Sequence, residues 1–157
     1  MLSLLHQRDP SERLQREIRG AAVVTADLAS AALDLALARC PAAIHGLQPN
    51  RIRALIAAQA WTDAALALIA LDPSRVLRHV INEDGEWRCT LGSLQPLPAW
   101  LDDTIEFAHP ELPLAILGAL TGALRRTSTP APPAASVPRS RAEPRELAAC
   151  VNCDNFA

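Results

Sequence analysis

Two cysteines near the C-terminal end of the chain have the spacing of a metal or redox site. Cys150 and Cys153 form a C-x-x-C pair, and two thiols at this spacing can share a metal ion or close a small redox disulfide. A structural zinc site needs four ligands, and the chain has no second C-x-x-C motif. We therefore interpret the pair as free thiols in a tail. Metal capture with ligands from a partner, and redox switching, are the alternatives.

His79 and Cys89 are a second candidate pair, because a β-hairpin between them would bring them opposite each other. Such a pair has the chemistry of two metal ligands or of a thiolate activated by an imidazole. Neither residue has an evident third partner in the sequence. Since both fall on the face that we assign to the core, where cysteine behaves as a small hydrophobe, we expect them to be structural.

Four titratable residues cluster ahead of the last apolar segment, namely Asp102, Asp103, Glu106 and His109. On a continuous helix they would occupy neighbouring positions, and Glu106 and His109 have the E-x-x-H spacing of di-iron bundles. Those sites need a second such motif and two further glutamates, which this chain does not offer. We therefore expect a solvated acidic face there, and we predict no catalytic residue and no cofactor.

The charge of the chain excludes a general nucleic-acid-binding surface. The net charge is -2 over 157 residues, and all fifteen basic residues are arginine, so no overall basic field surrounds the protein. The arginines form small groups near acids, such as 13, 16 and 19, or 125 and 126. Glu143 and Glu146 offset much of the positive charge of the tail arginines 139, 141 and 145. We expect no nucleic-acid partner.

The hydropathy pattern predicts a protein without a membrane segment. Residues 1–8 lack a basic region followed by a sustained apolar run, so we expect no signal peptide. The most apolar windows, 21–38 and 52–70, each contain polar or acidic residues that are costly at the centre of a bilayer. The run 112–124 is too short to span one. We expect a cytoplasmic protein.

The first helix has a strong start signal. Asp9 can cap, Pro10 suits the first helical position, and Glu12 stands where a capping box closes. Apolar residues at three- and four-residue spacings predict one continuous helix to about Arg39. Residues such as Leu33 and Leu37 widen its apolar stripe beyond a single packing partner.

A second helical region is expected between residues 50 and 72, with Asn50 as its cap and Pro73 after its end. The sequence leaves open whether this region is one helix or two. A single helix would set Gln59 and Asp63 among apolar residues, whereas a break would let Thr62 cap a new helix. We favour two short helices.

Alternating apolar residues flank a turn signal at residues 82–86, which predicts a β-hairpin over about 75–92. A two-residue Asp84-Gly85 loop would pair Glu83 with Glu86 and split the apolar residues between the two faces. A three-residue loop from Glu83 to Gly85 keeps them together, so we predict that register. The inward residues would be Leu77, His79, Ile81, Trp87, Cys89 and Leu91, and the outward ones Arg78, Val80, Arg88 and Thr90.

The remaining elements follow from proline and apolar spacing. We expect a short helix near residues 100–107 and a last helix from about Pro110 to Leu124. From residue 127 the chain is rich in proline, alanine and serine. Such a segment buries too little apolar surface to offset the conformational entropy that it would lose on folding. The prediction is one folded domain over 9–126 and a disordered Pro/Ala-rich tail over 127–157 that ends in the C-x-x-C pair.

Between residues 60 and 124 the chain resembles a group of small uncharacterised bacterial (proteobacterial) proteins. The resemblance depends on the segments Ala60-Trp61-Thr62-Asp63-Ala64-Ala65, Asp84-Gly85-Glu86-Trp87-Arg88-Cys89 and Leu97-Pro98-Ala99-Trp100-Leu101-Asp102. The group has no assigned activity, so the resemblance implies only a compact cytoplasmic domain.

The sequence thus predicts a mainly α-helical α+β domain with one antiparallel hairpin. We expect a small non-enzymatic interaction or accessory protein of the cytoplasm. Its partner, either another protein or a second copy, would bind an apolar helical face near Leu33 and Leu37, or the tail. The alternative is a metal- or thiol-responsive protein that works through Cys150 and Cys153.

Overall fold

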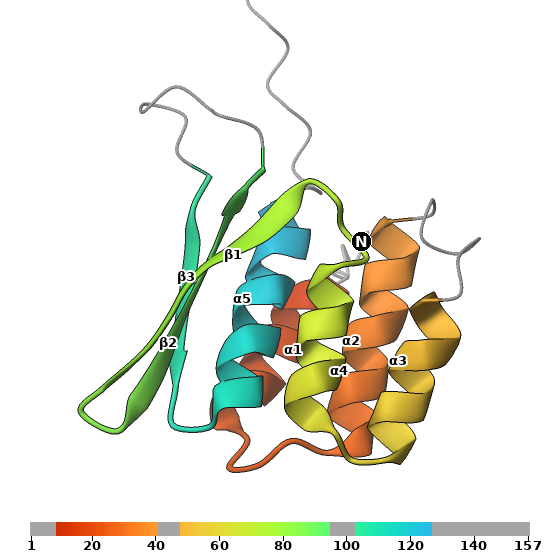
Figure 1. The fold of residues 1–157 in the computed structure, drawn as a ribbon, viewed down its shortest axis with the longest axis horizontal. Helices are drawn as coiled ribbons and strands as arrows, with labels where there is room; N and C mark the ends of the chain where they lie inside the picture. Colours follow the sequence, from red (N-terminus) through yellow and green to blue (C-terminus); the bar gives the residue numbers. More distant parts are fainter. Residues whose placement is uncertain (1–8, 41–47, 95–102, 127–157) are drawn as a thin grey trace, which may run out of the picture.

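The chain folds into helices that pack on one face of a small antiparallel sheet (Figure 1). The computed structural model describes residues 9–40, 48–94 and 103–126. Within these ranges the fold is mainly α-helical with an antiparallel sheet, which confirms the predicted class. The elements are α1 (Pro10–Gly20), α2 (Ala26–Arg39), α3 (Gln48–Ala57), α4 (Trp61–Ile69), β1 (Arg75–Glu83), β2 (Glu86–Ser93), β3 (Ile105–His109) and α5 (Leu112–Arg126).

Helix α5 lies at the centre of the domain, between the sheet and the other helices (Figure 1). Every residue from Leu114 to Leu124 is buried. The sequence explains this position, because these residues are apolar or small around the whole circumference of the helix, and a helix without a polar face must be enclosed. The helix begins two residues after the predicted start and extends two residues beyond the predicted end.

Two glycines let strand β3 approach α5 closely. A Cβ atom at Gly118 would lie 2.3 Å from Cδ1 of Phe107, and one at Gly122 would lie 3.0 Å from Cγ2 of Ile105. Phe107 and Ile105 are both buried residues of β3. The two glycines, one turn apart, therefore form a shallow channel in α5 that receives the side chains of the strand.

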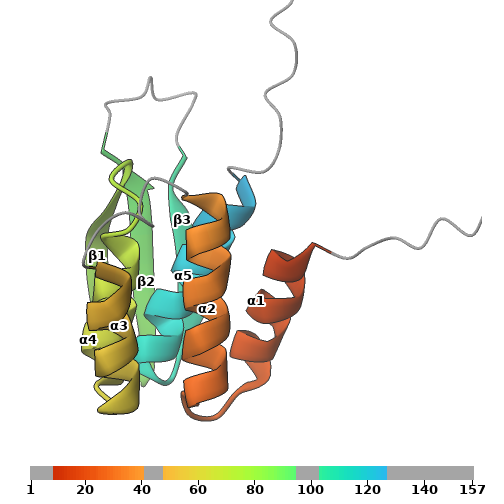
Figure 2. The ribbon, with the colours of Figure 1, turned by 90° about the vertical axis from the view of Figure 1, so that its right-hand side faces the viewer.

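The prediction of one helix from residue 10 to Arg39 is wrong, because the structure has two helices with a break at 21–25. Asp9 caps α1 as predicted, accepting a hydrogen bond from the Ser11 amide at 3.1 Å. Thr25 then caps α2, with its Oγ1 accepting from the Leu28 amide at 3.3 Å. The preceding valines and this threonine are β-branched, which lowers their helix propensity. Figure 2 shows α1 at one side of the helical layer, with α2 between it and α3.

The prediction of two short helices in the next region is confirmed, since α3 and α4 are separated by Gln59 in a left-handed conformation (φ 56°). The predicted caps are wrong. Helix α3 already begins at Gln48, so Asn50 lies inside it. Helix α4 follows Ala60, which makes no capping hydrogen bond through its side chain, so Thr62 is not the cap.

The predicted hairpin is present, but its register is wrong. The loop has two residues, Asp84 (φ 54°) and Gly85 (φ 84°), and Glu83 pairs with Glu86. Two successive positive φ angles are typical of a type I′ turn, whose twist matches that of the flanking strands. The turn chemistry of Asp-Gly therefore determines the loop length.

A two-residue loop was expected to divide the apolar residues between the two faces of the hairpin. An irregularity in β1 keeps most of them on the core face. The register shifts between Leu77 and His79, so one additional residue is accommodated there as in a β-bulge. Leu77 still pairs with Leu91, whereas Val80 pairs with Cys89 and faces the core. His79 and Ile81 consequently face outward, opposite to the prediction, and Ile81 is 42% exposed.

Gly85→Ala should lower the free energy of unfolding by about 1 kcal/mol, because an alanine at a positive φ angle brings its Cβ close to the backbone. Chemical denaturation of the full chain measures this change. Gly20→Ala is the matched control, since nothing lies within 4 Å of a Cβ at that position at the end of α1. Equal effects of the two substitutions would contradict the assigned turn.

The predicted helix near residues 100–107 is also wrong, because residues 105–107 belong to strand β3. Residues 95–102 lie outside the described residues. In β3, burial alternates strictly, with Ile105, Phe107 and His109 buried and Glu106 and Ala108 exposed. This period of two residues is the signal of a half-buried strand, and it is visible in the sequence once the helical spacing is set aside.

Strand β2 is the centre of the sheet, in the order β1-β2-β3. The helices cover one face of the sheet, and no described element covers the other (Figure 1). Both β1 and β3 are therefore edge strands within the described part of the chain. Edge strands carry unpaired backbone groups that can bind further strands.

Candidate functional site

The two cysteines named as candidate metal ligands belong to the C-terminal segment of the chain. Cys150 and Cys153 lie outside the described residues, as does the whole segment 127–157. Within 9–40, 48–94 and 103–126, no group of three or more histidine, cysteine, aspartate or glutamate side chains is arranged to hold a metal ion.

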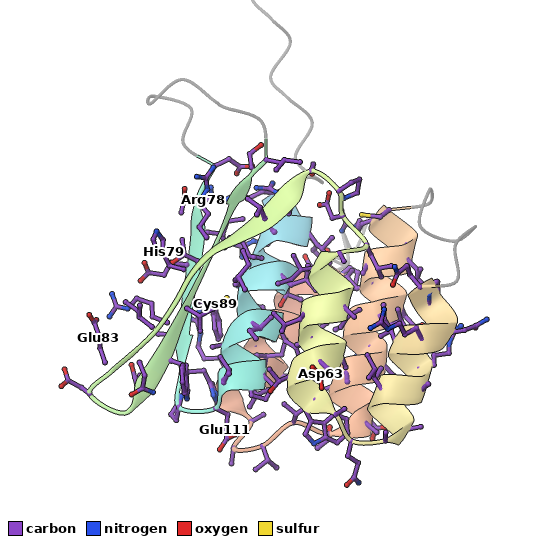
Figure 3. The ribbon with its side chains drawn as sticks, in the orientation of Figure 1. Asp63, Arg78, His79, Glu83, Cys89 and Glu111 are labelled. Carbon is purple, nitrogen blue, oxygen red and sulfur yellow. The ribbon has the colours of Figure 1, made fainter. Side chains whose placement is uncertain are left out.

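His79 and Cys89 are not brought together. His79 pairs with Thr90 and is exposed, while Cys89 pairs with Val80 and is fully buried. Figure 3 shows the imidazole directed away from the helices, whereas the Cys89 thiol lies between the sheet and α5. Burial raises the pKa of the Cys89 thiol to about 11, so the thiol stays protonated at neutral pH and is a core residue.

Alkylation of native protein at neutral pH should modify Cys89 at least about 100-fold more slowly than in the unfolded chain, because the reactive thiolate is scarce and enclosed. Mass mapping of iodoacetamide-treated protein, native and in denaturant, gives both rates. A rate for Cys89 in the native protein that equals the unfolded rate would contradict its burial.

The acidic cluster is divided by strand β3. Glu106 is exposed and His109 is buried, because residues three apart on a strand lie on opposite faces. The Glu111 amide donates to Nδ1 of His109 at 2.9 Å, and Nε2 lies 3.0 Å from the Ala21 carbonyl oxygen. Since Nδ1 accepts, Nε2 carries the hydrogen and donates to that carbonyl. His109 therefore ties the α1–α2 connection to the sheet.

Asp103 has a structural role as well. Its carboxylate lies 2.6 Å from the Arg75 guanidinium and 3.2 Å from that of Arg126. It joins the start of β1 to the end of α5. Asp102 lies outside the described residues.

The apolar helical face proposed for a partner is not an open surface. Leu33 is only 2% exposed and belongs to the core. Leu37 is partly buried and packs against the same core. The prediction that a partner binds at Leu33 is therefore wrong, because this side chain lies inside the fold, whereas Leu37 is only partly covered.

The structure reveals a groove that the sequence did not predict. It has a volume of about 590 Å³ and lies between α1, strand β3 and the C-terminal end of α5. Its lining comes from both ends of the described chain, because α1 packs directly on α5. The lining residues are Glu12, Gln15, Arg16, Arg19, Thr104, Ile105, Glu106, Phe107, Gly122, Arg125 and Arg126.

The groove is positively charged, with four arginines against two glutamates. Glu12 faces one of these four arginines, and Glu106 faces an arginine outside the groove. Glu12 lies 3.9 Å from Arg125, and Glu106 lies 3.1 Å from Arg88 on the uncovered face of the sheet. The acidic side chains of the groove thus have cationic neighbours, and further positive charge remains for a ligand.

Arg16 and Arg19 supply this remaining charge. They are exposed residues of α1, three apart and therefore on neighbouring positions of one helix face. Neither forms an ion pair with any described residue. The Arg19 guanidinium carbon stands 5.4 Å from the centroid of the Phe107 ring, a cation–π distance that holds this charge over an aromatic floor.

One wall of the groove is the edge of strand β3. Residues 104–107 all line it, although successive side chains of a strand point to opposite faces. Consecutive lining residues mean that the groove runs along the strand's edge. Ligands in it would therefore meet the backbone of β3 as well as arginine side chains.

The sequence could not place this groove, because its two groups of arginines are about a hundred residues apart and each group is small by itself. Only the packing of α1 against α5 brings the groups together, and the Gln15 amide, 3.5 Å from the Gly118 carbonyl oxygen, is part of this contact.

No described helix has the length and apolar character needed to cross a membrane. In comparisons with known proteins, no family model, no curated protein and no solved structure matches the chain.

Proposed function

We propose that this chain is a small, non-enzymatic interaction protein of the cytoplasm that binds an acidic segment of a partner protein in the groove between α1 and β3. The observation that carries the proposal is the position of Arg16 and Arg19. Both line the groove, and both lack an acidic partner among the described residues. Their guanidinium groups are available to carboxylates of a ligand.

The choice of arginine supports binding over proton transfer. A guanidinium group stays protonated at all physiological pH values and presents a planar fork of donors that fits a carboxylate. Such a group holds anions in place. It does not serve as a general acid or base, so the groove has the chemistry of recognition.

The size of the electrostatic contribution points to an extended ligand. An exposed ion pair contributes about 0–1 kcal/mol, whereas micromolar affinity corresponds to about 8 kcal/mol. Two arginines cannot supply that free energy by themselves. The ligand must also contact the apolar floor at Phe107 and Gly122 or the β3 backbone, as a peptide can and a small anion cannot.

A direct test measures binding of a defined acidic peptide. The probe is a heptapeptide with fluorescein on its N-terminal amine, an amidated C-terminus, glutamate at every second position and threonine or valine between. We expect Arg16→Glu with Arg19→Glu to weaken its binding at least about tenfold in fluorescence anisotropy, because like charges then repel. Raising the salt concentration should weaken binding to the unmodified protein.

The matched control reverses the charge of two arginines outside the groove, with Arg51→Glu and Arg53→Glu on the exposed side of α3. It changes the net charge by the same amount and should leave binding within about twofold. Equal loss in both double variants would contradict the proposal, since binding would then follow net charge and not the groove. Cys150→Ser with Cys153→Ser should also leave peptide binding unchanged, whereas a loss would favour the thiol-responsive alternative.

A further inference from the structure

We infer that the acidic partner segment binds as an added β-strand along the edge of β3 that no described element covers, extending the sheet from three strands to four. This inference rests on the proposed function and specifies the conformation of the ligand. It follows from the geometry of the groove wall, the state of the two sheet edges and the spacing of the arginines.

The β3 edge has unused hydrogen-bonding capacity. In an antiparallel strand, alternate residues direct their N–H and C=O groups to the same side. Strand β2, which pairs with β3 from Ile105 to His109, takes one of these two sets. Apart from that ladder, no described backbone group bonds to residues 105–108. The other set therefore faces the groove and can pair with a peptide backbone.

The opposite edge of the sheet is a poorer template. Strand β1 contains the register shift between Leu77 and His79, which interrupts a continuous ladder. Arg78 beside it folds across the sheet onto Gly92 and donates to the Ser93 carbonyl oxygen at 2.9 Å. Such irregularities are a common protection of edge strands. Strand β3 pairs with β2 without a shift from Ile105 to His109.

The arginine spacing matches an extended ligand. Arg16 and Arg19 are three apart on a helix, so their Cβ atoms are about 5–6 Å apart. Side chains on one face of a strand repeat every second residue, about 6.6 Å apart. Carboxylates at alternate positions of an added strand can therefore meet successive arginines. The added strand's other face lies beside the exposed Glu106, which favours neutral residues there.

Backbone methylation of the peptide tests the strand geometry. One version of the heptapeptide carries N-methyl groups on the glutamates, and a second carries them on the intervening residues. A strand at an edge uses the amides of one set and leaves the other set free. We expect one version to bind at least about tenfold more weakly than the parent peptide and the other to bind within about threefold.

The outcomes separate this inference from the proposed function. If both methylated peptides bind as well as the parent while Arg16→Glu with Arg19→Glu still weakens binding, the groove takes acidic segments but not as a strand. Equal loss for both versions also contradicts a strand that is paired on one side only. If the parent peptide does not bind, or if the arginine substitutions have no effect, the proposed function itself fails.

Discussion

Leu117→Ala is expected to lower the free energy of unfolding by about 2–5 kcal/mol, the range for removing a leucine side chain from a closed core. Leu117 is 1% exposed and lies in the middle of α5. This helix contacts the sheet on one side and α1, α2 and α4 on the other, so no single neighbour can move to fill the cavity. The loss should therefore lie toward the upper end of the range.

Guanidinium denaturation of the full chain measures the effect. Leu66→Ala in α4 is the control, because it removes the same atoms from a side chain that is 40% exposed. It should cost a minor fraction of the Leu117→Ala value. A comparable loss in the two variants would show that α5 is not the centre of the core.

Gly118→Val should destabilise the protein by about 1–3 kcal/mol, the usual cost of overpacking a core. A Cβ atom at Gly118 would stand 2.3 Å from the Phe107 ring, which is buried. In an ordinary helix the loss of a glycine stabilises by up to about 1 kcal/mol. The close approach of β3 to α5 reverses that sign.

A double-mutant cycle isolates this contact. Phe107→Ala removes the ring that would collide with the new side chain, so Gly118→Val should cost at least about 0.5 kcal/mol less in that background. If Gly118→Val lowers the free energy of unfolding equally with and without the ring, the close packing of Phe107 against Gly118 is contradicted. In that case the loss would come from the backbone of α5 and not from its contact with β3.

Local signals in the sequence predicted much of the fold. The Asp9-Pro10 start of α1, the central apolar helix and the position of the hairpin were all visible, because capping, hydropathy period and turn chemistry act over a few residues. The class of the fold followed from them. These features need no knowledge of distant contacts.

Two of the wrong predictions, the single first helix and the hairpin register, depended on spacing within one segment. The break after Gly20 is stabilised by His109, from the far end of the chain, bonding to the Ala21 carbonyl. The irregularity in β1 lets an Asp-Gly turn coexist with a buried Val80. Neither arrangement can be derived from the spacing within its own segment.

The candidate site lay beyond sequence reasoning for the same reason. Arg16 and Arg19 appear as an ordinary polar helix face, and Ile105 to Phe107 appear as part of a helix with acidic neighbours. The groove exists only because α1 and β3 both pack against α5. A strict alternation in residues 105–109 was the one local signal that could have revealed the edge strand.

Binding of an acidic peptide between α1 and β3 is the central claim. Amide NMR of the full chain, titrated with the alternating glutamate peptide, tests it most directly. We expect the largest shift changes at residues 105–108 of β3 and at Arg16 and Arg19 of α1. Changes that are largest in β1 or beyond residue 126, with none along β3, would contradict the claim.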